Sequence, residues 1–195
     1  KMVSEIADIP RKLAKTINLG LFYGMGKGKL MSQLGVNLED ATEMLANYNE
    51  RVPFVKQLMN DTMSRAGKKG FLSTIEGRRC RFEEWEPINE WGKKSLPLKE
   101  AQQEYGEHMI KRAWTYKALN RLIQGSAADQ TKKAMLELYK QGYMAHIQVH
   151  DELDFSVANE KDKSKIKEIM EHAIKLQVPS KVDVECGSNW GDAGD

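Results

Sequence analysis

Two clusters of side chains in this sequence combine residue types and spacing that suit phosphate chemistry. Near the start, Arg11 and Lys15 lie four residues apart, and Leu19 and Tyr23 continue the same spacing. Residues four apart share one face of a helix. The two cations therefore form a clamp for a polyphosphate, in which arginine binds oxygens as a fork and lysine acts as a point charge. An amphipathic helix with a solvated basic face is the alternative for this pattern.

The second cluster is the tripeptide His150-Asp151-Glu152, which stands between the alternating segments 143–149 and 153–157. Apolar residues at every second position favour strands. The pattern therefore predicts a hairpin with charged residues near its tip and buried side chains along its strands. Adjacent carboxylates at a tight turn can hold a hard divalent cation through oxygen. The alternative is that polar residues simply populate turns.

A pair of amides and a run of arginines are weaker candidates for nucleic-acid contacts. Asn120 and Gln124 lie one helical turn apart, and amides that both donate and accept suit base edges in the minor groove. A satisfied buried amide is the alternative. Arg78, Arg79 and Arg81 can meet a phosphate backbone, although charged runs are usually just solvated.

The charge of the chain is unevenly distributed. Its 195 residues carry 30 basic and 28 acidic side chains, but residues 1–82 carry 14 basic against 8 acidic ones, a net charge of +6. A basic front half suits phosphate or nucleic acid, because lysine and arginine displace condensed counterions, and an ordinary solvated surface is the alternative. The apolar stretches are only a few residues long, which predicts no membrane span. The two cysteines are far apart, which argues against a zinc knuckle or a disulfide framework.

The sequence predicts mainly helices in its first part, and helices together with short strands in its later part, as the elements that position these residues. Apolar periodicity and capping residues predict helices over 11–23, 38–51 behind an Asn37 cap, 53–66, 98–140 with an interruption near 124–126, and 162–176. Strand-like stretches are expected over 71–75, 143–149, 153–157 and 182–186, a hairpin turn with a basic arm over 77–81, and irregular structure over 83–97. This order predicts an α+β fold with a boundary near residue 115.

Three segments in this order resemble motifs of the family A DNA polymerases. Residues 11–24 (RKLAKTINLGLFYG) resemble motif B, residues 148–153 (QVHDEL) resemble motif C, and residues 120–129 resemble the helix between them. The ending GSNW is also similar to the family's C-terminus. The resemblance covers essentially the whole chain. It implies a helical fingers subdomain over 1–115, followed over 116–195 by the C-terminal part of a palm with an antiparallel β-hairpin and flanking helices.

The resemblance implies a template-directed DNA polymerase that adds deoxynucleotides to a primer by two-metal nucleotidyl transfer. Arg11 and Lys15 would hold the phosphates of the incoming deoxynucleoside triphosphate, with Lys15 also catalytic. Leu19 and Tyr23 would lie at the insertion site. Arg11 and Lys15 would then converge with Asp151 on one nucleotide.

The resemblance also assigns the metal site. Asp151 would ligate the two Mg²⁺ ions, with Glu152 as an accessory catalytic carboxylate. The family's motif A, which supplies the other metal-binding aspartate, and its thumb have no counterpart between Lys1 and Asp195. We therefore expect little or no activity from this chain alone. The N-terminal part of a polymerase would complete it, as the rest of a longer protein or as the other half of a split enzyme.

Contacts with primer–template DNA are implied at seven residues. These residues are Gly24, Arg78, Arg79, Asn120, Gln124, Gln148 and His150. A non-catalytic nucleic-acid-binding module derived from a polymerase is the alternative to the enzyme. Leu19 stands where the family usually carries Phe or Tyr, which hints at a phage-type polymerase. The expected location is the cytoplasm of a bacterium or of a phage-infected cell.

Replacing Leu19 with tyrosine is expected to raise the incorporation of dideoxynucleotides, because the resemblance places this side chain near the sugar of the incoming nucleotide. The measurement is primer extension with mixed deoxy- and dideoxynucleotides, with the N-terminal part of the polymerase supplied. Unchanged discrimination between the two sugars would contradict the assignment of Leu19.

Overall fold

The computed structural model describes residues 14–15, 20, 27–90 and 92–193. These residues form helices and small antiparallel sheets, which confirms the predicted α+β class. The chain divides into two compact units, Lys1–Ile123 and Gln124–Asp195. The subdomain boundary near residue 115 stays a prediction. No helix within the described ranges is both long and apolar enough to cross a bilayer.

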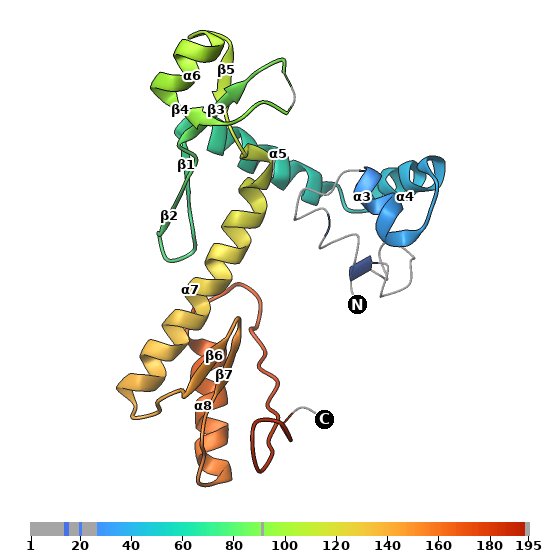
Figure 1. Cartoon of the computed structure of the whole chain (residues 1–195). Coiled ribbons are helices and arrows are strands. Elements are labelled where there is room, and N and C mark those ends of the chain that lie inside the picture. Colours follow the sequence, from blue (N-terminus) through green and yellow to red (C-terminus); the bar gives the residue numbers. More distant parts are fainter. Residues whose placement is uncertain (1–13, 16–19, 21–26, 91, 194–195) are drawn as a thin grey trace. The chain divides into compact units, whose positions relative to one another are not determined.

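In the first unit, three successive helices share one apolar cluster (Figure 1). They are α3 (Lys27–Leu34), α4 (Leu38–Arg51) and α5 (Pro53–Lys69). The side chain of Asn37 caps α4 by accepting a hydrogen bond of 2.8 Å from the Asp40 amide, as its place before the helix predicts. The buried members of the cluster are Leu30, Ala41, Tyr48, Val52 and Val55.

The end of α5 lies beyond the predicted end at Ala66. The helix continues through Gly67 and stops at Gly70, whose φ of 75° is left-handed. The Gly70 amide donates to the Ala66 carbonyl at 2.9 Å. Glycine is the residue that adopts this conformation without a steric penalty, so Gly70 and not Gly67 terminates the helix.

A short hairpin follows this helix, as predicted. Strands β1 (Phe71–Ser73) and β2 (Arg79–Arg81) pair antiparallel, with Leu72 opposite Cys80. A second apolar cluster joins the end of α5, this hairpin and the start of α7 (Ala118–Lys140). Its buried members are Ala66, Leu72, Phe82 and Ala118.

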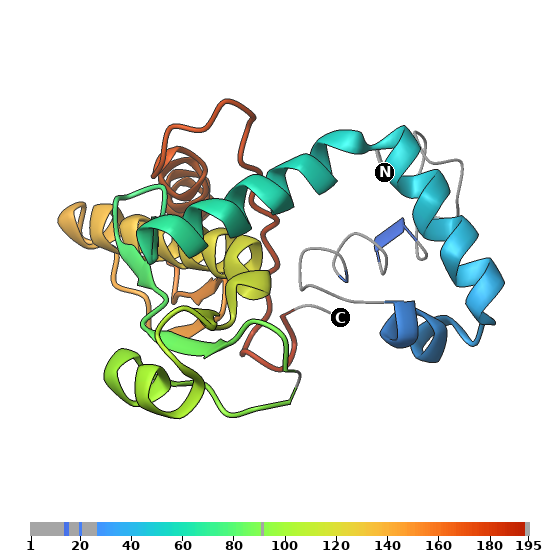
Figure 2. The same cartoon turned by 90° about the horizontal axis from the view of Figure 1, so that it is seen from above.

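The prediction for the segment between the hairpin and α7 is wrong in two respects. Residues 83–97 are not irregular throughout, and the helix expected from residue 98 does not continue into α7. Instead, a three-stranded sheet in the order β4-β3-β5 forms, with α6 beside it (Figure 2). The elements are β3 (Glu84–Pro87), β4 (Leu96–Pro97), α6 (Leu98–Tyr105), β5 (Ile110–Arg112) and the short 3-10 helix η1 (Thr115–Lys117). Gly106, with a φ of 89°, follows α6, and the sheet pairs residues too far apart in sequence for periodicity to reveal.

Arg112 ties this small sheet to the end of α5. Its Nη1 donates to the Phe82 carbonyl at 2.7 Å, and its guanidinium lies 4.5 Å from the centre of the Trp85 ring. A Cβ atom built on Gly70 would come within 2.6 Å of the Arg112 Cζ. Gly70 therefore serves both as a left-handed helix cap and as the space that Arg112 occupies.

The second unit consists of most of α7, one hairpin and one further helix. α7 runs through 124–126 without a break, so the predicted interruption there is wrong. Strands β6 (Ile147–Val149) and β7 (Glu152–Asp154) pair antiparallel, and α8 (Glu160–His172) follows behind an Asn159 cap. The strand predicted over 182–186 is absent from these described residues. The Val182 amide donates instead to the Glu171 carboxylate at 3.1 Å.

Two glycines at the end of α5 give a matched test of this fold. Gly67→Ala is expected to raise the free energy of unfolding by about 0.5–1 kcal/mol, because it replaces a helical glycine with open space around it. Gly70→Ala is expected to lower the free energy of unfolding by about 1–3 kcal/mol, because alanine is strained at this φ and meets Arg112. Urea unfolding followed by circular dichroism measures both, and equal effects of the two substitutions would refute the account of the cap.

Candidate functional site

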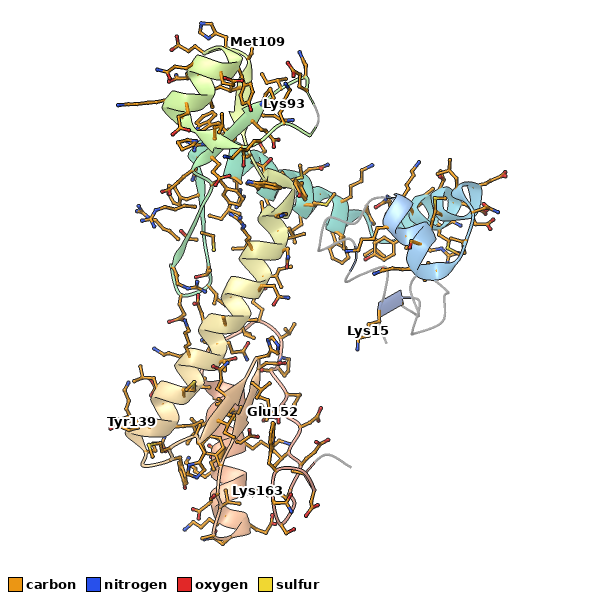
Figure 3. The ribbon with its side chains drawn as sticks, viewed as in Figure 1. Lys15, Lys93, Met109, Tyr139, Glu152 and Lys163 are labelled. Atoms are coloured by element: carbon orange, nitrogen blue, oxygen red, sulfur yellow. The ribbon has the colours of Figure 1, made fainter. Side chains whose placement is uncertain are left out.

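The predicted acidic turn is present in the second unit. Val149 pairs with Glu152, so His150 and Asp151 form a two-residue turn between β6 and β7. Asp151 and Glu152 are both exposed, and Glu152 lies at the start of β7 (Figure 3). The hairpin therefore presents two neighbouring carboxylates to solvent.

The backbone of this turn is unusual at His150. His150 has a φ of 53°, and Trp114 is the other described residue with a positive φ that is not glycine. A left-handed conformation costs a residue with a side chain roughly 1–3 kcal/mol and is often found at functional sites. The side-chain amide of Gln148 donates a hydrogen bond of 2.6 Å to the carbonyl of His150.

One face of the β6–β7 hairpin packs against an apolar cluster, and the other face is exposed. Leu153 and Phe155 pack against the cluster of Leu138, Ile166 and Ile169. The side chains of Ile147 and Val149 are 44% and 36% exposed. The prediction of strands buried along their length is therefore wrong for β6. Within the second unit, the apolar cluster lies on the other face of the hairpin, because strand side chains alternate between faces.

The carboxylate oxygens of the turn fit part of the coordination shell of a Mg²⁺ ion. Mg²⁺ prefers oxygen ligands, usually keeps several waters, and is commonly held by one or two carboxylates together with substrate phosphates. Asp151 and Glu152 supply such oxygens, and neither carboxylate has a hydrogen bond or an ion pair among the described residues. Across the described ranges, no three His, Cys, Asp or Glu side chains gather closely enough to enclose a metal ion. The turn therefore fits an open site with further ligands from water, phosphate or other chain segments.

The predicted amide pair lies on α7. Asn120 is half-buried and Gln124 is exposed, and the four-residue spacing on one uninterrupted helix puts both on the same face. Nearby on this helix, Arg121 braces the first hairpin. Its Nη1 donates to the Arg81 carbonyl at 3.1 Å, and its guanidinium lies 4.9 Å from the centre of the Phe82 ring.

The arginines of the β1–β2 hairpin divide between its two faces. Arg79 and Arg81 are exposed and alternate with Cys80, so they share one face with Phe71, which pairs with Arg81. The Arg79 guanidinium lies 4.7 Å from the centre of the Phe71 ring, which orients it. Arg78 lies opposite Thr74, whose amide donates to the Arg78 carbonyl at 2.9 Å. Arg81, the third arginine of the predicted run, also forms an ion pair with Glu83, with 3.7 Å between its Nε and a carboxylate oxygen.

The predicted nucleotide clamp falls mostly outside the described residues. Lys15 is described and has helical backbone and an exposed side chain. The residues outside the described ranges are Arg11, Leu19, Tyr23 and Gly24. The convergence of this clamp with the acidic turn stays a prediction.

Comparison with known proteins points to one family. The model of "DNA polymerase family A" matches residues 1–192 of the chain. The DNA-directed DNA polymerase of Pseudomonas phage M6 is 36% identical over 225 residues, an alignment that covers 98% of this chain and 31% of the phage protein. DNA polymerase I of Bacillus subtilis is 33% identical over 198 residues, which cover 97% of this chain and 20% of that enzyme.

A solved structure agrees with these sequence matches. The POL domain of Pol1 from M. smegmatis, in complex with DNA primer-template and dNTP, aligns with a TM-score of 0.75 and 28% identity. The alignment covers 99% of this chain and 34% of that one. The chain therefore spans about a third or less of the proteins that it matches.

Proposed function

Because this chain belongs to DNA polymerase family A, we propose that it forms the fingers and the C-terminal part of the palm of a template-directed DNA polymerase. The observation that carries this proposal is the two-residue acidic turn, which exposes Asp151 and Glu152 within a chain that matches the family over residues 1–192. The fingers would take residues 1–115 and the palm residues 116–195.

The carboxylates of the turn would hold the metal. Asp151 would ligate Mg²⁺, and Glu152 would support it as an accessory carboxylate. Two Mg²⁺ ions, when bound, would activate the primer hydroxyl and neutralise the leaving pyrophosphate. A position at the turn of a paired hairpin suits this role, because the strands fix where the carboxylates can lie while leaving them open to substrate.

The clamp near the start of the chain would bind the incoming nucleotide. Arg11 and Lys15 would neutralise the triphosphate, and charge placed in advance around a reacting phosphate lowers the barrier to transfer. The exposed side chain of Lys15 is free to approach such a ligand. Leu19 and Tyr23 would line the insertion site.

The DNA-facing residues would come from three elements. The face of the β1–β2 hairpin that carries Arg79 supports a contact with the sugar-phosphate backbone, since that guanidinium is exposed and held by Phe71. The remaining residues proposed to meet primer–template DNA are Gly24, Arg78, Asn120, Gln124, Gln148 and His150.

An upstream segment would complete the enzyme. The chain corresponds to 31% of the phage polymerase that it resembles, and the second metal-binding aspartate and the thumb would come from the rest of such a protein. The bare face of β6, with Ile147 and Val149 exposed, suits packing by a further palm segment. Such a polymerase would act in the cytoplasm of a bacterium or of a phage-infected cell.

Asp151→Asn is expected to reduce primer extension by roughly 100- to 1,000-fold, the usual effect of removing a group that stabilises charge in the transition state. The assay uses this chain joined to the upstream segment of the phage M6 polymerase, with Mg²⁺, deoxynucleotides and a primed template. Asp183→Asn is the matched control, because it neutralises an exposed carboxylate outside the proposed site. Tight, salt-sensitive DNA binding without extension by the parent protein would favour the non-catalytic binding module.

Arg79→Ala is expected to weaken DNA binding similarly for all sequences and to lower the slope of log affinity against log salt by about 1, because one phosphate contact is lost. Fluorescence anisotropy with a labelled primer–template at several salt concentrations measures this slope. Lys99→Ala on α6 removes another exposed cation and is expected to leave the slope unchanged. Equal slopes for Arg79→Ala and the parent chain would exclude Arg79 as a phosphate contact.

A further inference from the structure

Two exposed aromatic residues are neighbours in the segment between β5 and α7. Trp114 follows β5 and Tyr116 belongs to η1, and the two residues are 36% and 43% exposed. Their ring centres are 6.2 Å apart and the ring planes are inclined by 52°, so the rings do not stack face to face on each other. Single exposed apolar residues are common on protein surfaces, but two adjacent rings offer aromatic faces that suit a planar ligand.

Hydrogen bonds hold the indole of Trp114 in place. Its Nε1 donates to the Glu84 carboxylate and to the Ser95 hydroxyl, at 3.1 Å in each case, and the Ser95 hydroxyl itself donates to Glu84. These hydrogen bonds, chiefly the one from Ser95, hold the pKa of Glu84 below its ordinary value, so the carboxylate is charged at neutral pH and accepts both. The ring is therefore ordered before any ligand arrives, which lowers the entropy cost of binding.

A lysine ammonium lies over both rings. The Nζ atom of Lys117 is 4.3 Å from the centre of the Trp114 ring and 5.5 Å from the centre of the Tyr116 ring. In the part of the chain that the structure describes, this ammonium has no ion pair with a carboxylate. A cation–π contact at an exposed site is weak, so a phosphate oxygen can draw the ammonium away from the rings and leave their faces open.

Aromatic rings beside a cation that is not neutralised match the two parts of a nucleotide. Any base can stack on an aromatic side chain, because every base has a π-face, and a nearby cation can meet its phosphate. Bases inside a duplex are already stacked on one another, so only an unpaired base is available to a side chain. We propose that Trp114, Tyr116 and Lys117 form a binding site for an unpaired nucleotide, whose base stacks on the rings and whose phosphate lies against Lys117.

This inference rests on the proposed function, because it takes DNA as the ligand, and it adds three residues to the proposed DNA contacts. Asn120, which is one of those contacts, follows Tyr116 by four residues. A polymerase substrate offers unpaired nucleotides from two sources, which are the template ahead of the primer and a downstream strand displaced from that template. The chemistry of base and phosphate is the same in both, so the experiment tests the two sources separately.

The experiment measures the affinity of the 195-residue chain for labelled DNAs by fluorescence anisotropy. The probes are a blunt duplex, the same duplex with an unpaired 5′ extension of the template, and a nicked duplex whose downstream strand has an unpaired 5′ tail. Tyr116→Ala is expected to weaken binding to DNA with unpaired bases by roughly 5- to 100-fold, the usual effect of removing one stacking ring, and to leave blunt-duplex affinity unchanged. Tyr116→Phe keeps the ring and is expected to bind like the parent. Tyr139→Ala, at an exposed tyrosine of the second unit, is the matched control.

Lys117→Met tests the phosphate contact. It is expected to lower the slope of log affinity against log salt by about 0.7 for DNA with unpaired bases, the value for one phosphate of a single strand. Lys117→Arg keeps the charge and is expected to retain the slope of the parent. If Tyr116→Ala does not unfold cooperatively, Tyr116→Leu, which keeps apolar bulk without a ring, takes its place.

The pattern across the three DNAs decides the proposal. A selective loss with the template extension, with the tailed strand or with both supports the site and identifies the source of its nucleotide. Equal affinities of Tyr116→Ala and the parent for all three DNAs, an equal loss on the blunt duplex, or failure of Tyr116→Phe to retain binding would overturn it.

Asp151→Asn distinguishes this inference from the proposed function, because the binding assay contains no Mg²⁺ and does not depend on Asp151. If Tyr116→Ala loses selective binding while Asp151→Asn retains full primer extension, the nucleotide site stands and the metal role of Asp151 is wrong. If Asp151→Asn abolishes extension while Tyr116→Ala binds every DNA like the parent, the proposed function stands and the nucleotide site is wrong.

Discussion

The pairing of Val149 with Glu152 is the constraint on which the acidic turn depends. This register leaves two residues to reverse the chain, and a reversal so short requires a left-handed backbone at the first of them. His150 accepts that conformation, so the strain of the turn falls directly beside Asp151. The apolar cluster beneath Leu153 and Phe155 holds β7 in place. The strands thus fix the position of the carboxylate through the backbone, without any ion pair to it among the described residues.

In the first unit, a small apolar core determines which arginine side chains of the β1–β2 hairpin are exposed. The cluster around Leu72 and Phe82 buries one face of the β1–β2 hairpin, and strand alternation then turns Arg79 and Arg81 outward. Three guanidiniums near this cluster lie over aromatic rings, those of Arg79, Arg112 and Arg121. Such stacking restrains a long side chain while leaving its charge unneutralised. Of the two outward arginines of β2, Arg79 is held by such stacking, whereas Arg81 forms an ion pair with Glu83.

The sequence predicts well those features that are set by neighbouring residues. The bounds of α4 follow from the Asn37 cap and from Pro53, which starts the next helix, and the acidic turn follows from alternation on either side of His150. The sheet β4-β3-β5 is missed because β4 has only two residues and β5 pairs with β3 across the length of α6. The exposure of β6 is missed because periodicity identifies strands but not which of their faces has a partner. The bond from Gln148 to the His150 carbonyl depends on the rotamer of one side chain, which no spacing rule reports.

These two kinds of feature have different consequences for function. Residue types can identify the family and supply the charges, because the chemistry of phosphate transfer needs carboxylates and cations whatever holds them. Where each charge lies depends on strand pairing and packing, which residue types do not report. The register of β6 and β7 leaves Asp151 in a two-residue turn, and the packing of Leu153 and Phe155 leaves the opposite face of the hairpin exposed. The acidic turn is therefore specified jointly by its residue types and by the hairpin that carries them.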